Sequence, residues 1–228
     1  MLIIDTNGVT SLSLQSDNIS DLTGIEFFTD LESLTAFNNN LSNIDLSQNT
    51  ALIDVNVGGN SLTSIDVSSN PDLELLGVSN NSIVNLDVSQ NPNLDTLFCA
   101  NNQLETLNVQ NGNNVNFTNL EADANPNLDC IQVDDVNYSQ TNWLGGGFDF
   151  QFDSGVFFSV DCSQPQIINI PDANFEQVLI DEGIDSDGII NGQMIESDAL
   201  GVFDLDVSSQ NISDLTGIEF FTDLETLS

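Results

Sequence analysis

Hydrophobic positions recur along this chain at a fixed interval. Four segments with the same pattern begin 21 residues apart, at Leu31, Leu52, Leu73 and Leu94. In each segment hydrophobic residues occupy the first, fourth, sixth and eleventh places, and an asparagine occupies the ninth. Because successive side chains of a strand point to opposite faces, the alternation around the fourth and sixth places predicts a short strand in every segment. Less regular copies begin at Val9 and Phe117.

Each unit also carries a second group of hydrophobic residues. In the unit 52–72 this group is Leu62, Ile65 and Val67. One coil of chain cannot hide so many apolar side chains, but stacked coils can, and each buried side chain stabilises the fold by roughly 1.5–3 kcal/mol. The pattern therefore predicts a contiguous, capped array of stacked coils over residues 1–125.

Asparagines mark the bends of the predicted coils. One column follows the strands, at Asn39, Asn60, Asn81 and Asn102. A second column, Asn49, Asn70 and Asn91, marks the other bend. We expect the asparagine amides to bond backbone groups that the turns leave unpaired. The motif L-x-x-L-x-L-x-x-N-x-L is the leucine-rich-repeat signature. It predicts an α/β-type solenoid, mostly β, shaped as a horseshoe of 21-residue units with a parallel sheet on its concave face.

A different pattern follows the array and predicts a C-terminal β cap over residues 126–162. Phe148, Phe150 and Phe152 alternate with polar residues, as in a strand. Residues 153–155 are predicted as a turn, and residues 156–160 as the return strand. We expect a disulfide between Cys130 and Cys162, which fits an exported protein. Cys99 occupies a core position of its strand and is interpreted as a small hydrophobic residue.

The cap aromatics allow two interpretations. Tyr138, Trp143 and the phenylalanines could pack as a lid on the last coil, or they could offer a platform on which a carbohydrate stacks. We favour lid packing.

A second array is predicted to begin near the end of the chain. Residues 163–169 form a linker, 170–201 the N-terminal cap of the next array, with a helix starting at Pro171, and 202–228 its first repeats. Residues 211–225 are identical to residues 18–32. We therefore expect this chain to be a fragment of a longer protein with tandem arrays, whose first array lacks its N-terminal cap here and whose signal peptide is not in this fragment.

Three motifs carry a family resemblance: the 21-residue unit, the cap sequence NPNLDCIQVDD that begins at Asn125, and IPDANFEQ at Ile170 followed by ISDLTGIE at Ile212. Together they resemble the leucine-rich-repeat domains of secreted surface proteins of Bacteroidota, chiefly flavobacteria, which are internalin-like in layout. The resemblance implies a secreted or cell-surface location and a role in adhesion or recognition.

The charge balance excludes several functions. The chain has 36 Asp and Glu residues and no Lys, Arg or His, so its formal net charge is -36. Nucleic-acid binding needs basic side chains to neutralise phosphates, and anionic membrane surfaces would repel this chain. Catalytic triads that need histidine are excluded. No stretch is long and apolar enough for membrane insertion. Salt or divalent cations would relieve the self-repulsion.

The candidate binding residues lie on the predicted concave face. Residues on either side of the central hydrophobic residue of each strand should point outward. We select Asp54, Asn56, Leu75, Thr96, Phe98, Asn119 and Glu121. Leu75 and Phe98 are apolar and on neighbouring coils, so we expect an exposed apolar pair. This pair either marks a contact with an extracellular protein or carbohydrate or consists of ordinary scattered surface hydrophobic residues, and the second interpretation is favoured.

Calcium is the one cofactor to which the sequence points. Asp185, Asp187 and Asn191 resemble half of an EF-hand loop, although the usual ligands at its first and twelfth places are missing. The alternative is a plain Asp-Gly turn. A column of Asp45, Asp66 and Asp87, continued by Asn108, could either bridge calcium or bond the backbone of its own turns.

Three functions compete. The chain is a non-catalytic recognition module, a structural spacer in a long surface protein, or an enzyme. Paired carboxylates would suit a glycosidase, but nothing in the sequence resembles a catalytic motif. We expect a recognition module and no enzyme.

Overall fold

The computed structural model describes residues 6–144, 149–163 and 167–228. Phe148 and linker residues 164–166 lie outside these ranges. The chain forms two compact units, residues 1–162 and 163–228. Each is built around its own hydrophobic core.

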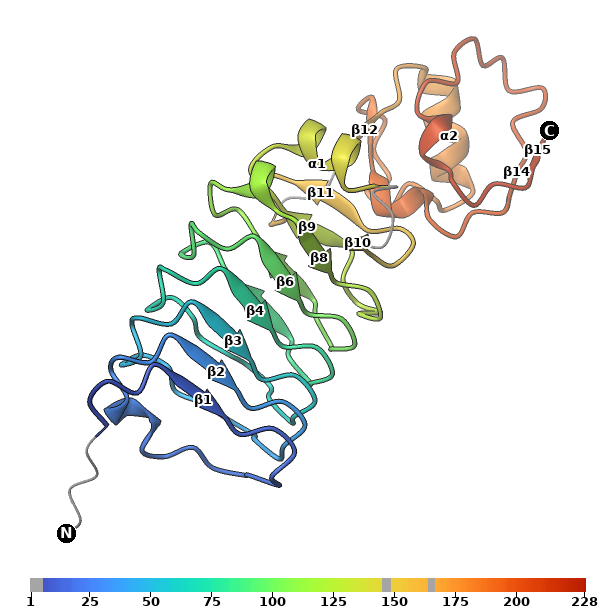
Figure 1. The fold of residues 1–228 in the computed structure, drawn as a ribbon. Coiled ribbons are helices and arrows are strands. Elements are labelled where there is room, and N and C mark those ends of the chain that lie inside the picture. Colours follow the sequence, from blue (N-terminus) through green and yellow to red (C-terminus); the bar gives the residue numbers. More distant parts are fainter. Residues whose placement is uncertain (1–5, 145–148, 164–166) are drawn as a thin grey trace. The chain divides into compact units, whose positions relative to one another are not determined.

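The first unit contains a parallel sheet of seven short strands, which Figure 1 shows side by side. In spatial order they are β1 (Ser11–Ser13), β2 (Ser33–Thr35), β3 (Asp54–Asn56), β4 (Leu75–Gly77), β6 (Thr96–Phe98), β8 (Asn119–Glu121) and β10 (Phe150–Gln151). Leu34 pairs with Val55, Val55 with Leu76, and Leu76 with Leu97, so equivalent residues 21 positions apart lie side by side. Each repeat therefore contributes one strand to this sheet.

A second parallel sheet, which the sequence analysis did not predict, arises from the other half of the later repeats. It consists of β5 (Asn85–Asp87), β7 (Thr106–Asn108), β9 (Cys130–Gln132) and β11 (Phe157–Ser159). Their central residues Leu86, Leu107, Ile131 and Phe158 are at most 2% exposed. Short 3-10 helices, η1 (Ile25–Phe27) and η2 (Asn114–Asn116), complete two of the bends.

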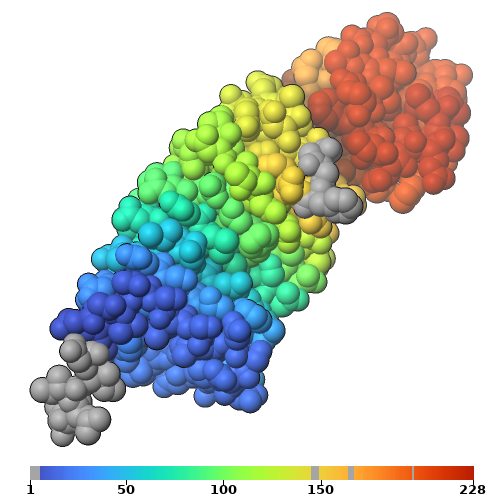
Figure 2. Space-filling view, in the orientation of Figure 1, coloured from blue at the N-terminus to red at the C-terminus, as the bar shows by residue number. Residues whose placement is uncertain are grey.

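The hydrophobic residues of successive coils form one continuous core. The strand centres Leu34, Val55, Leu76, Leu97 and Leu120 are 0–1% exposed. In the space-filling view the coils follow one another as bands from blue to yellow (Figure 2). Stacking thus buries what no single coil could hide.

The asparagine columns join neighbouring coils. Asn81 donates from Nδ2 to the carbonyl of Val78 in its own coil (2.9 Å) and to that of Val57 in the preceding coil (3.2 Å). Its Oδ1 accepts from the Leu62 amide (2.9 Å). In the second column, the Nδ2 of Asn70 donates to the carbonyls of Leu46 and Asn49. Each asparagine closes a turn and also bonds it to the turn before it.

The cap contains one more coil of the solenoid. A strand is present within the predicted residues 156–160, as β11, but it does not return along β10 as predicted. β10 extends the seven-stranded sheet by pairing with β8, and β11 extends the other sheet by pairing with β9; both pairings are parallel. The physical reason is that β8 and β9 would otherwise leave unpaired backbone groups at two separate sheet edges. Asp153, in the bend between the two strands, accepts the amides of Ala124 and Asn125 (2.9 and 2.7 Å).

A helix and a buried tryptophan fill the end of this unit. Helix α1 (Val136–Asn142) begins after Asp135, whose carboxylate caps it by accepting the Tyr138 amide (3.1 Å). Trp143 is 1% exposed and packs against Phe117, Phe150 and Phe158, with ring centroids 5.6–5.7 Å apart. Its rings are therefore part of the lid and offer no face on which a sugar could stack.

The three cysteines occupy two environments. Cys130 and Cys162 form a disulfide that ties β9 to the end of the unit. Cys99 is a free thiol and fully buried.

The second unit contains the predicted helix, α2 (Ala173–Asp181). An antiparallel pair, β12 (Ile167–Asn169) and β13 (Gln193–Ile195), flanks it, and two 3-10 turns follow, η3 (Glu196–Ala199) and η4 (Ile218–Phe220). The last strands, β14 (Asp204–Leu205) and β15 (Thr226–Leu227), are parallel and 22 residues apart in register. Asp172 caps α2 with Oδ1, while its Oδ2 accepts the amides of Ser213 and Asp214.

Candidate functional site

The structure arranges the candidate binding residues in two rows across the seven-stranded sheet. Asp54, Leu75, Thr96 and Asn119 pair successively in one row. Asn56, Gly77, Phe98 and Glu121 pair in the other. The buried strand centres separate the rows. The sheet therefore brings together residues 65 positions apart in the sequence, from Asn56 to Glu121.

The predicted exposed apolar pair needs correction. Leu75 and Phe98 lie on adjacent strands but in different rows, since Leu75 pairs with Thr96 and Gly77 pairs with Phe98. Both side chains are partly buried. Alternate residues of a strand face the same side, so the two are diagonal neighbours on one face of the sheet.

A hollow of about 310 Å³ lies at the second row. Gly77 sits between Asn56 and Phe98, where the other strands carry side chains. A Cβ atom at position 77 would come within 3.1 Å of the Asn56 side chain, so the glycine makes room for Asn56 to lie close against β4. Its lining includes Phe37, Asn38, Asn56, Gly77, Phe98 and Glu121.

Two further glycines line the hollow in the turn after β3. A Cβ at Gly58 would lie 3.0 Å from the carbonyl oxygen of Ser79. Gly59 has a φ of 65°, the conformation that Asn38 and Asn80 adopt at the equivalent positions of their own coils. Sequence reasoning selected Asn56, Phe98 and Glu121 but missed Phe37 and the glycines. The available signal was glycine at positions where other repeats have larger residues.

Glu121 gives the hollow a carboxylate. Among the described residues, no hydrogen bond to this carboxylate is present. Burial, and then the charge of Asp123, raise the pKa of Glu121. The hollow thus combines phenylalanine rings, asparagine amides and one incompletely solvated carboxylate, and the chain contains no basic side chain to pair with it.

Three other candidate binding residues, Thr96, Asn119 and Asp54, lie outside the hollow. The Thr96 hydroxyl lies 2.8 Å from Asp95 Oδ1 and 3.1 Å from the Thr118 hydroxyl. Asn119 is partly buried, and its Oδ1 has no hydrogen-bond partner. Asp54 is exposed at the edge of the first row. These residues border the hollow's row without lining it.

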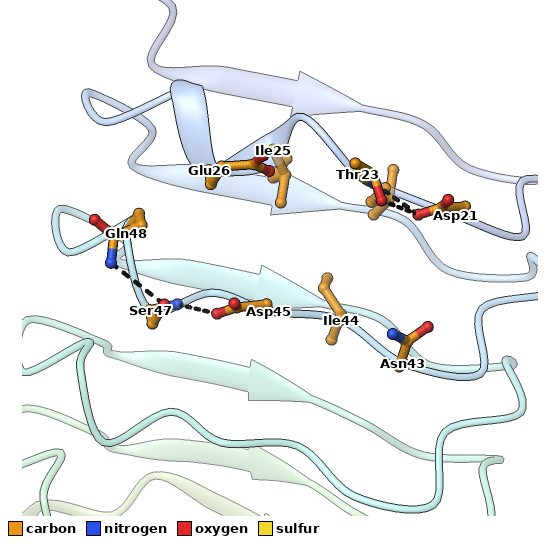
Figure 3. A pocket seen from close by; sticks show the side chains of 10 residues that line it. Asp21, Thr23, Ile25, Glu26, Asn43, Ile44, Asp45, Ser47 and Gln48 are labelled. Atoms are coloured by element: carbon orange, nitrogen blue, oxygen red, sulfur yellow. Dashed lines mark hydrogen bonds between the residues drawn. The ribbon is translucent and has the colours of Figure 1, made fainter.

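A second hollow, of about 360 Å³, lies between two neighbouring coils near the start of the first unit (Figure 3). Its carboxylates come from Asp21, Glu26 and Asp45. Asp21 accepts the amide and hydroxyl of Thr23 (2.8 and 2.7 Å), and Glu26 accepts the Gly24 amide (2.7 Å). Each carboxylate already bonds its own turn, so we assign this hollow no ligand.

The aspartate column bonds the backbone. Asp45, Asp66 and Asp87 accept the amide two residues further on, at 2.8–2.9 Å. Hydrogen bonds from the side chain and then the backbone of Ser47 lower the pKa of Asp45, and Ser68 acts likewise on Asp66. These bonds favour the turn interpretation over calcium bridging.

The predicted calcium loop also uses most of its polar groups internally. Asp187 accepts the Ile189 amide (2.7 Å) and the Asn191 side chain (2.8 Å), and Asn191 Oδ1 accepts the Gln193 amide (2.8 Å). Asp185 is 4% exposed, and its Oδ2 has no partner. Burial, with the neighbouring carboxylates of Asp187, Glu176 and Asp198, raises the pKa of Asp185. Calcium binding here stays a prediction.

Two further features, a cluster of metal-binding side chains and a membrane-spanning helix, are absent from the described residues. No group of three or more His, Cys, Asp or Glu side chains is arranged to hold a metal ion. No helix in the same part of the chain is long and apolar enough to cross a membrane.

The parallel sheets, the few helices and the buried asparagine turns fit a leucine-rich-repeat solenoid, and comparison with solved structures points the same way. The functional domain of InlJ from Listeria monocytogenes is 34% identical, with a TM-score of 0.51, over 56% of this chain and 30% of that domain. A Leptospira interrogans leucine-rich-repeat protein, LIC12759, is 22% identical over 60% of this chain and 34% of its own, with a TM-score of 0.48. Internalin C2 from L. monocytogenes is 12% identical over 98% and 81%, with a TM-score of 0.49.

The chain thus spans 30% of the length of the InlJ domain to which it is similar. No protein-family model and no curated protein sequence matches this chain.

Proposed function

We propose that this chain is a non-catalytic recognition and adhesion module that binds an extracellular protein on the face of its seven-stranded sheet. The observation that carries the proposal is the hollow at Gly77, where Asn56, Phe98 and Glu121 from three strands converge. The likeness to the functional domain of InlJ supports the fold on which this proposal rests.

The rigid sheet suits such a role. The side chains on it are held by strands whose centres are buried and whose turns are bonded coil to coil, so the face is organised before a partner arrives. A partner would then lose little affinity to reorganisation of this surface. A carbohydrate ligand on the same face is the alternative that the asparagine amides favour.

Export is part of the proposal. A disulfide between Cys130 and Cys162 is typical of proteins that work in an oxidising compartment. The net charge of -36 favours the solubility of such a module and disfavours its binding to ligands that carry phosphate groups.

The test probes arrays of extracellular proteins and of glycans with the full chain and with the double variant Leu75→Ser/Phe98→Ser. The matched control is Phe27→Ser/Val115→Ser, which removes two apolar side chains that are 67% and 60% exposed elsewhere. We expect a protein ligand whose affinity falls at least tenfold in the first variant and stays constant in the control, with unchanged circular dichroism in both.

Two outcomes would overturn the proposal. Binding that both variants weaken equally would not involve the sheet face. An intact chain that binds nothing on either array would favour the remaining candidate, a structural spacer within a longer surface protein.

A further inference from the structure

The hollow at Gly77 has a chemical character that narrows its ligand. Three kinds of group surround it: the rings of Phe37 and Phe98, the side-chain amides of Asn38 and Asn56, and the carboxylate of Glu121. The aromatic rings attract cations through their π faces. The carboxylate and the amide oxygens accept hydrogen bonds. A planar cation that donates several hydrogen bonds suits the ring of Phe98 and the carboxylate of Glu121 together, while Asn56 Oδ1 already accepts the Gly58 amide (3.2 Å).

The register explains how these groups meet. Asn56, Gly77, Phe98 and Glu121 are successive partners on β3, β4, β6 and β8. Parallel strands lie about 4.8 Å apart, so Phe98 is flanked by Gly77 on one side and by Glu121 on the other, and Asn56 lies beyond Gly77. The ring of Phe98 and the carboxylate of Glu121 are therefore direct neighbours.

The size of the hollow limits its occupant. A volume of about 310 Å³ is at the small end of the range of ligand sites, about 300–1,000 Å³. It suits one long side chain better than an oligosaccharide or a drug-sized molecule. Gly58 and Gly59 also line the hollow near the turn, and neither has a side chain that could project into it.

The composition of the chain bears on the charge of the group that would bind in the hollow. With no Lys, Arg or His in the sequence, no residue of this protein can neutralise Glu121. Asp123 adds a second negative charge close by. A positive group in contact with Glu121 can therefore come only from outside the chain.

We propose that the hollow at Gly77 binds an arginine side chain of the protein partner, stacked on Phe98 and hydrogen-bonded to Glu121. The proposal rests on the proposed function, because it names the chemistry by which the sheet face would recognise its partner. Arginine is favoured over lysine since its guanidinium is planar, stacks on rings and donates in a fork that matches a carboxylate.

The electrostatics of Glu121 agree with this geometry. Burial and Asp123 both make its ionised form less favourable in the free protein. A guanidinium in contact would offset both effects. The bound state would thus satisfy a group that the free protein leaves without a partner.

The experiment uses the full chain and a short peptide, acetyl-Gly-Arg-Gly-amide, titrated by NMR at 0.05 and 0.15 M salt. The matched probe replaces arginine with citrulline, which keeps the shape and removes the charge. We expect amide shifts to be largest at Gly77, Phe98 and Glu121, and affinity for the citrulline peptide to be at least tenfold lower. A lysine peptide should bind a few fold more weakly than the arginine peptide.

Two variants separate local from general attraction. Glu121→Gln removes the carboxylate in the hollow, whereas Glu105→Gln removes an exposed charge from another surface. We expect the first to weaken the arginine peptide at least fivefold and the second less than twofold. Phe98→Leu should weaken it as well, without changing the melting temperature by more than a few degrees.

Equal weakening by the two glutamine variants would overturn the proposal, as would equal binding of the arginine and citrulline peptides. Failure of the proposed function gives a different pattern. A protein ligand found on the array that is lost in Leu75→Ser/Phe98→Ser but indifferent to Glu121→Gln would keep recognition by the sheet and remove arginine as its anchor. If the arginine peptide binds as expected but no protein on the array depends on the sheet face, the arginine site is kept and the proposed recognition function is rejected.

Discussion

Replacing Asn102 by alanine should destabilise the first unit, because this side chain bonds four backbone groups of two coils. Asn102 is 1% exposed. Its Oδ1 accepts the Ile83 amide (3.0 Å), and its Nδ2 donates to the carbonyls of Val78 (3.0 Å), Cys99 (3.1 Å) and Ala100 (3.4 Å). The alanine variant removes all four bonds at once.

The four losses differ in size, and the long bond to Ala100 adds little because that carbonyl also accepts the Asn80 amide. The carbonyl of Val78 also accepts from Asn81, and that of Cys99 also accepts from Asn125, so each keeps one partner. Losing one bond to each costs about 0.5–1.5 kcal/mol. The Ile83 amide has no second partner among the described residues, and an unpaired buried amide costs about 1–3 kcal/mol. The expected loss is therefore about 2–6 kcal/mol, a large share of the roughly 5–15 kcal/mol typical of domains.

Urea unfolding followed by Trp143 fluorescence measures this loss in the first unit alone, because Trp143 is the only tryptophan of the chain and is buried there. Hydrogen exchange at the Ile83 amide gives a local measurement. The matched control is Asn93→Ala, an exposed position in the coil before Asn102. The reasoning would be refuted if the two variants differed by less than about 0.5 kcal/mol, within the usual scatter of surface substitutions.

The remaining predictions concern the disulfide, the free thiol and the second unit. Reducing Cys130–Cys162, which closes a separation of 32 residues, should lower the stability of the first unit by about 3–4 kcal/mol in the same urea assay; an unchanged midpoint would contradict this. Burial raises the pKa of the Cys99 thiol well above its usual range, so it should stay unreactive toward a thiol reagent in the native chain and react only in denaturant. Hydrogen bonds from the backbone and then the side chain of Ser213 hold the pKa of Asp172 well below its ordinary 3.8, so its contribution to stability is present above about pH 4 and is lost as the pH falls toward the lowered value. The melting temperature of the second unit should thus fall below pH 4 in the native chain, and Asp172→Asn should flatten that dependence; equal slopes would contradict the assignment.

The repeat pattern predicted much of the core correctly. The fourth and sixth places of each repeat, such as Val55 and Val57, are buried as expected, and the asparagines at the ninth place bond the turns. These features depend on neighbours along the chain and on a fixed period. A periodic pattern states which side chains must be buried, so local sequence is enough to predict them.

The cap shows where local sequence misleads. A turn at residues 153–155 between two hydrophobic runs is typical of a hairpin, yet β10 and β11 join different sheets. The choice between a hairpin and one more coil depends on which partner edges lie nearby. Those edges belong to β8 and β9, which end 32 and 21 residues before Asp153 in the sequence, and no local signal reports them.

The sequence likewise predicted only part of the candidate site. The sequence by itself determined that Asn56, Phe98 and Glu121 face outward from their strands, since the alternation of each strand decides this. Only the tertiary structure decided that they surround one hollow, because that required the parallel register to place Gly77 between Asn56 and Phe98. The hollow is lined by residues of several neighbouring strands. Its shape therefore depends on neighbours one coil away, about 21 residues distant along the chain but only about 4.8 Å across the sheet.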